Sequence, residues 1–146
     1  MSKAKDIGTR AETAVKNHLL EVGYTPLQAH RNVLKGSADE GDVWLREPQF
    51  GLIVFEVKGG KAAKDASVNQ IQKWWAETLT EKKNANADYA FLVTQRAGVG
   101  YPRAGEWWVY IDLETLTYLT TRLNTYRKIN PLLRLQLGEL IKLIHG

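Results

Sequence analysis

The 146-residue chain contains no cysteine. It therefore has no disulfide, no thiolate-bound zinc, no iron–sulfur cluster and no cysteine nucleophile. Its three histidines, His18, His30 and His145, are far apart in the sequence, so any metal is expected on carboxylate oxygens, which favour Mg²⁺ or Mn²⁺. No apolar run reaches the roughly 18 residues of a membrane span, and residues 1–10 lack a signal-like stretch. We expect an intracellular, cytoplasmic protein with no membrane partner.

The first 120 residues carry no net charge, and the excess of basic residues lies at the end of the chain. Residues 1–120 hold 15 basic and 15 acidic residues, and the formal net charge of +4 resides in residues 121–146. That segment has one acidic residue, Glu139, and five basic ones: Arg122, Arg127, Lys128, Arg134 and Lys142. A polyanionic partner and the solvated face of an amphipathic helix are both consistent with this excess.

The hydrophobic pattern predicts a single α/β domain spanning residues 1–146. The expected elements are a helix over 7–22, strands over 25–32, 42–46, 51–58, 89–94 and 107–113, and helices over 66–83, 114–124 and 131–144. Loops are expected at 35–41 and 95–106, and Pro131 suits a first helical position. The result is a mixed sheet of about five strands flanked by helices, with a core at about 7–113 and a C-terminal helical extension at about 114–146.

The end of the apolar strand over 51–58 carries the strongest candidate for chemistry. Alternate strand residues share a face, so Glu56 and Lys58 leave the buried strand together. If the two central strands pair as a hairpin, Asp42 converges on Glu56, and two carboxylates plus a lysine can hold a divalent cation and an activated water. The alternative is a solvated ion pair of little energetic value. Glu12, at the edge of the first helix's apolar face, could likewise cap or snorkel instead of binding metal.

Three short motifs resemble the PD-(D/E)XK nuclease superfamily in their order and spacing. They are Gly8-x-x-x-Glu12, Gly41-Asp42 after a Gly-Ser loop, and Glu56-x-Lys58 before an amphipathic helix. Within it, the chain is most similar to the Holliday junction resolvases of archaea and bacteriophages. The resemblance covers about residues 7–113 and implies a restriction-endonuclease-like fold. A bacteriophage member would act in the host cytoplasm. Gly41 stands where many members have proline.

The resemblance implies roles for individual residues. Asp42 and Glu56 would bind the metal, and Lys58 would be catalytic. Glu12 would help to hold a metal, and Val57 belongs to the predicted metal-binding set. The expected cofactor is Mg²⁺ or Mn²⁺. The implied products are a 5′-phosphate and a 3′-hydroxyl. The residues predicted to contact DNA are Ser37, Lys35, Lys61, Lys64, Gln70 and Arg31. Gln72 is an alternative to Gln70. For Lys61 and Lys64 a merely solvated loop is the alternative, and for Trp74-Trp75 and Trp107-Trp108 we weigh base stacking against core packing.

We therefore expect a metal-dependent endonuclease that resolves four-way DNA junctions. The alternatives are a nuclease for flaps, nicked duplex or restriction-type sites, and a DNA-binding protein of the same fold without catalysis. Two cuts need two sites, so we expect a homodimer. The many apolar residues of 131–144 would form its contact, unless they pack inside one monomer.

Overall fold

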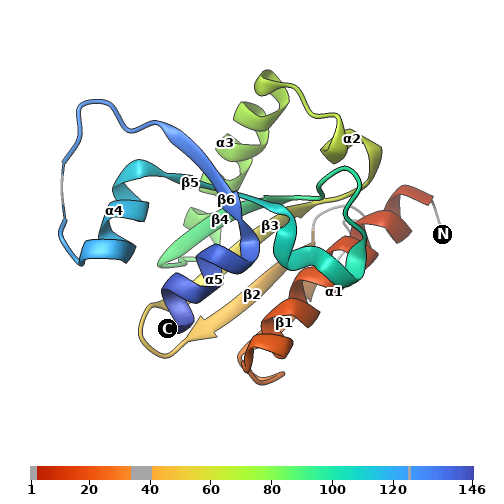
Figure 1. Ribbon diagram of the computed structural model, residues 1–146, viewed down its shortest axis with the longest axis horizontal. Coiled ribbons are helices and arrows are strands. Elements are labelled where there is room, and N and C mark those ends of the chain that lie inside the picture. Colours follow the sequence, from red (N-terminus) through yellow and green to blue (C-terminus); the bar gives the residue numbers. More distant parts are fainter. Residues whose placement is uncertain (1–2, 34–40, 125) are drawn as a thin grey trace.

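A computed structural model describes residues 3–33, 41–124 and 126–146, which form a mixed α/β fold (Figure 1). The elements in chain order are α1 (Lys3–Val22), β1 (Ala29–Val33), β2 (Gly41–Glu47), β3 (Gly51–Lys58), α2 (Gly60–Lys64), α3 (Val68–Asn84), β4 (Tyr89–Thr94), η1 (Tyr101–Glu106), β5 (Trp108–Asp112), α4 (Leu113–Thr121), β6 (Leu132–Gln136) and α5 (Leu137–His145).

The sheet has six strands in the order β1-β2-β3-β4-β5-β6. Only β3 and β4 are parallel, joined through α2 and α3, and the other neighbours are antiparallel. This crossover is the connection that parallel strands require. The predicted α/β class and mixed sheet are confirmed, with one strand more than expected.

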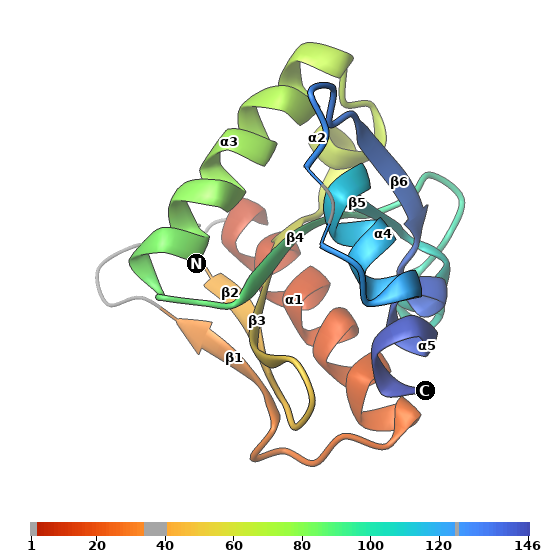
Figure 2. The same ribbon diagram turned by 90° about the vertical axis from the view of Figure 1, so that its left-hand side faces the viewer.

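Helices cover both faces of the sheet (Figure 2). On one face α1, α4 and α5 pack on alternate strand residues, with Ile53, Phe55 and Val57 of β3 in a continuous apolar core. We call this the α1 face. The intervening residues Val54, Glu56 and Lys58 point to the opposite side, where Lys58 contacts residues of α3. We call that side the α3 face.

The C-terminal segment differs from its prediction. Instead of one helix over 131–144, β6 extends the sheet beside β5 and α5 begins only at Leu137. The main-chain carbonyl of Pro131 accepts a hydrogen bond from Leu113 N–H at 3.0 Å, and Pro131 leads into β6, so it does not begin a helix. The helix starts where Gln136 and Glu139 form a capping box, a signal that the continuous apolar run conceals.

The same segment removes the argument for a dimer contact there. Four apolar residues of α5 are buried in the core of this chain: Leu137, Leu140, Ile141 and Ile144. Leu133 and Leu135 pack against that core from β6. The apolar residues that suggested a second partner are therefore accommodated within one chain.

Smaller differences concern element ends. The predicted loop over 95–106 contains the 3₁₀ helix η1, a short helix α2 follows the Gly59-Gly60 break, and α4 ends three residues early at Thr121. The first strand is 29–33, because the chain turns at 25–28 before it pairs. In residues 3–33, 41–124 and 126–146, no helix combines the length and the apolar character that crossing a membrane requires.

Candidate active site

Asp42 and Glu56 lie directly opposite each other on the antiparallel strands β2 and β3. Both point to the α3 face, and their exposed fractions are 2% and 7%. Buried carboxylates are costly unless they are paired or bind a metal. The hairpin therefore brings together the two predicted carboxylates in an environment that needs a compensating charge.

Lys58 supplies part of that charge. Its Nζ lies 3.1 Å from Glu56 Oε1 and 3.6 Å from Glu77 Oε2, and 5.7 Å from the centre of the Trp74 ring. Burial alone would lower the pKa of Lys58, but the carboxylates of Glu56 and then Glu77 raise it above its usual value. The lysine is thus held as a cation beside Glu56.

Helix α3 contributes acidic residues that the sequence pattern did not single out. Glu77 binds Lys58, and the Glu81 carboxyl, one turn on, is close enough to Asp42 to raise the pKa of that residue. Glu77 and Glu81 have i, i+4 spacing, and so do Trp74 and Thr78 beside them. This spacing is the signal that could have placed both acidic residues on the helix face towards the sheet. Burial first, then Glu56 and Glu81, raise the pKa of Asp42 to about 10.

Glu12 approaches from α1. It is 5% exposed, and its Oε1 accepts hydrogen bonds from Nε and Nη2 of Arg31 at 3.1 and 3.0 Å. Burial raises the pKa of Glu12, and Arg31 opposes that change, while the charges of Glu56 and Lys58 also act on it. Arg31, which is predicted to contact DNA, holds Glu12 in place through these two hydrogen bonds.

Close packing at the end of β3 positions α1 relative to the site. A Cβ at Gly59 would lie 2.6 Å from the Cβ of Ala11, one residue before Glu12. Buried Gln95, which the sequence analysis missed, accepts a hydrogen bond from Gly60 N–H at 2.8 Å. The glycine permits the approach, and the amide fixes the turn that follows β3.

The remaining predicted residues are more dispersed. Lys61 and Lys64 are exposed on α2, Gln70 is half-buried and Gln72 is exposed on α3. The side chain of Val57 belongs to the apolar core of the α1 face, so only its main-chain carbonyl offers an oxygen. Ser37 and Lys35 lie outside the described residues.

The two tryptophan pairs behave differently. Trp107 is fully buried, so core packing holds for one member of that pair, while Trp108 is half-buried. Trp74 and Trp75 are both half-buried, so neither is a fully buried core residue.

The carboxylates fit a hard divalent cation better than any other group. Asp42 and Glu56 present adjacent oxygen donors, whose mutual repulsion a bound Mg²⁺ or Mn²⁺ would offset. Over residues 3–33, 41–124 and 126–146, no cluster of three or more histidine, aspartate or glutamate side chains has the spacing of a formed metal site. The pair Asp42–Glu56 is therefore the candidate anchor, with Glu12 and Glu81 as its acidic neighbours.

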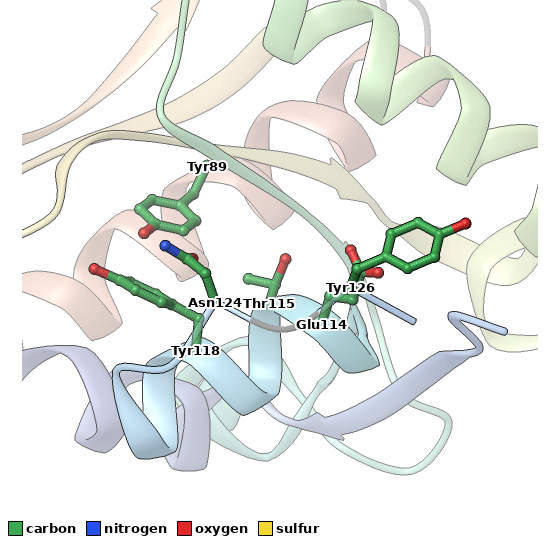
Figure 3. A pocket seen from close by; sticks show the side chains of 6 residues that line it. All are labelled: Tyr89, Glu114, Thr115, Tyr118, Asn124 and Tyr126. Atoms are coloured by element: carbon green, nitrogen blue, oxygen red, sulfur yellow. The ribbon is translucent and has the colours of Figure 1, made fainter. Parts of the chain in front are cut away.

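A separate hollow of about 550 Å³ lies between α4 and the start of β4 (Figure 3). It is lined by Tyr89, Glu114, Thr115, Tyr118, Asn124 and Tyr126. Tyr89 begins β4 opposite Ile53, so this hollow is near the far end of the strand pair that carries Lys58 and Thr94. None of the residues that line this hollow belongs to the candidate site around Asp42 and Glu56.

Comparison with known proteins adds no relative: no protein-family model, curated protein or solved structure matches the chain.

Proposed function

We propose that this protein is a metal-dependent, structure-selective DNA endonuclease that resolves four-way junctions by phosphodiester hydrolysis. The proposal includes a restriction-endonuclease-like fold and membership of the PD-(D/E)XK nuclease superfamily. One observation carries it: Asp42 and Glu56 face each other across β2 and β3, with Lys58 two residues further on the same face. This is the arrangement that the resemblance to the resolvases requires.

The residues divide the chemistry of hydrolysis among them. Asp42 and Glu56 would hold Mg²⁺ or Mn²⁺, with Glu12 as a neighbouring acid. When bound, the cation supplies a water of lowered pKa and a positive charge for a phosphate oxygen. Lys58, kept protonated by Glu56, stabilises negative charge that develops on the phosphate. Glu77 competes for the same ammonium, so it orients Lys58 before DNA binds.

The elements of the described residues favour recognition of DNA shape. Sequence-specific cutting usually needs additional recognition elements, and residues 3–33, 41–124 and 126–146 form one sheet with its flanking helices. We therefore favour junctions over restriction-type sites. Flaps and nicked duplexes remain alternative substrates that the test below distinguishes.

Cleavage of labelled DNA tests the proposal. A four-way junction, a flap, a nicked duplex and a linear duplex, all of matching arm sequence, are incubated with the protein and Mg²⁺, and with Ca²⁺ as a control for binding without turnover. We expect cuts in the junction only, leaving 5′-phosphate and 3′-hydroxyl ends. Equal cutting of the duplex would indicate a different nuclease. Binding of the junction without cleavage in Mg²⁺ or Mn²⁺ would indicate a non-catalytic DNA-binding protein.

Resolution of a junction also predicts a homodimer. One chain holds one Asp42–Glu56–Lys58 set, whereas two strands must be cut, most simply by two copies related by a two-fold axis. Sedimentation with and without the junction tests this, and a monomer in both conditions at micromolar concentration would contradict it.

A further inference from the structure

The α3 face is only partly covered. Helix α3 packs on β3 and β4, so it shields Glu56 and Leu92, whereas β5 and β6 lie beyond it (Figure 2). Trp108 and Tyr110 of β5 are half-buried there, and Arg134 of β6 is exposed. The sheet therefore presents a partly open surface beside the candidate active site, where Tyr110 and Arg134 line a hollow together with the start of α3.

Two arginines converge on one indole in this strip. The guanidinium carbon of Arg96, which follows β4, lies 4.2 Å from the ring centre of Trp108. That of Arg134 lies 4.0 Å from the same centre. The two cations are thus no more than about 8 Å apart, and the ring stabilises both. We call Arg96, Trp108 and Arg134 the guanidinium–indole cluster.

Nearby acidic groups have other partners. Glu106 is bound by both Nε and Nη2 of Arg103 at 2.7 Å, although its charge and that of Arg96 still influence each other. The main-chain carbonyl of Glu106 accepts a long hydrogen bond from Arg96 at 3.4 Å. Asp112, at the other end of β5, caps α4 by accepting from Thr115 N–H. The cluster consequently keeps a positive surface.

The cluster is in register with Lys58. Lys58 pairs with Thr94 across β3 and β4, and Thr94 pairs with Trp108 across β4 and β5. Since neighbouring strands are about 4.8 Å apart, Trp108 lies about 10 Å from Lys58 along the sheet. All three residues are on the same face, so one bound molecule can reach both the catalytic lysine and the cluster.

Resting on the proposed nuclease function, we propose that the guanidinium–indole cluster binds the phosphate backbone of the DNA arm that leaves the active site across β5 and β6. Phosphates of one strand recur every 3.4 Å or so along the helix axis, and guanidinium forks bind them through paired N–H groups. Because arginines already contact the indole, Trp108 acts as their support and not as a platform for a base. Arg134 thereby gives one residue of the basic C-terminal segment a direct role.

The test measures DNA affinity against salt concentration. Arg96→Gln, Arg134→Gln and the double variant are compared with wild type by fluorescence anisotropy, using the labelled junction and Ca²⁺ in place of Mg²⁺. Each single substitution is expected to weaken binding on the order of tenfold and to lower the salt slope by about one, and the double variant by about two. The matched control is Lys142→Gln, exposed on α5 on the opposite side of the sheet. It should change neither quantity by more than about twofold.

The outcomes separate this inference from the function on which it rests. If the wild type cuts the junction and the arginine variants keep its affinity and salt slope, the cluster has no role in binding and the nuclease proposal stands. If the wild type binds DNA without cutting and the variants lose affinity as expected, the surface is supported and the nuclease proposal fails. An equal loss in Lys142→Gln would show general electrostatic attraction and overturn the assignment. Melting temperatures equal to that of wild type exclude misfolding of the variants.

Discussion

The two faces of strand β3 lie in different environments. Ile53 and Phe55 on the α1 face are fully buried among apolar side chains. Glu56, between Phe55 and Val57, is almost as buried but lies among charged groups of β2, β3 and α3. A strand reverses its side chains at every residue, so one eight-residue element can stabilise the fold on one side and concentrate charge on the other.

The two faces of β3 separate the residues that stabilise the fold from those of the candidate site. Burial on the α1 face contributes to folding through the hydrophobic effect, whereas burial of Asp42 and Glu56 opposes it. Such a cost is typical of sites that bind ligands. Substitutions of Asp42 and Glu56 should therefore alter activity without loss of stability, and those of Ile53 and Phe55 should do the reverse.

The largest expected effect comes from the carboxylates. Asp42→Asn or Glu56→Gln should abolish junction cleavage, because each removes an anionic oxygen donor for the metal. Junction binding should persist or tighten, since less negative charge faces the DNA backbone. Gel assays of cleavage and anisotropy in Ca²⁺ measure the two effects. Cleavage by Glu56→Gln within about twofold of wild type would remove that residue from the site.

Loss of Lys58 should have the next largest effect. Lys58→Ala should lower the single-turnover cleavage rate by a factor on the order of 10², the usual consequence of removing a group that stabilises transition-state charge. The Mg²⁺ dependence of the rate should shift far less. Lost metal binding, measured by calorimetry, would instead make Lys58 a structural residue.

A pair of glycines tests the α1 side of the site. Gly59→Ala should destabilise the protein by about 1–3 kcal/mol, because the new Cβ would meet Ala11 at 2.6 Å. Gly8→Ala is the matched control in α1: its nearest contact, Glu12 Oε2, is 3.9 Å away, and alanine favours the helix by up to about 1 kcal/mol. Urea unfolding measures both, and equal stability of the two variants would refute the close packing.

The smallest effect is on the pH dependence of stability. The pKa of Asp42 rises from 3.8 to about 10 in the folded state, so the folded chain holds this proton more tightly than the unfolded chain. The associated stability is complete below about pH 4 and is lost as pH rises towards 10. Without metal, Asp42→Asn should therefore increase the free energy of unfolding at pH 8 by about 1–3 kcal/mol.

Chemical unfolding at pH 5 and pH 8 checks this, with Mg²⁺ absent and present. Asp65→Asn, on the exposed surface, serves as the control, and its free energy of unfolding should change with pH as that of wild type does. If the free energy of unfolding of Asp42→Asn also changed with pH as in wild type, this would contradict the effect of burial on the Asp42 carboxyl.

The central hairpin could be predicted because its signals are local. The apolar run ending in Glu56-Val57-Lys58 specified a buried strand, and the turn near Pro48 brought Asp42 opposite Glu56. The partners on α3 escaped prediction because Glu77 and Glu81 are separated from this hairpin by a crossover. The i, i+4 spacing of the two acidic residues places them on one face of the helix, but it does not show which strands that face meets.

The C-terminal segment shows the other limit. Alternating and helical burial give the same appearance in a short leucine-rich run, so Leu132–Gln136 could not be assigned from its pattern. It is a strand because the edge of β5 offers unpaired main-chain groups, which β6 satisfies. The sequence by itself determined the α/β class, the central strands and the residues that carry charge. Only the tertiary structure decided which of those charges meet, because register, crossover and edge pairing join residues far apart in the chain.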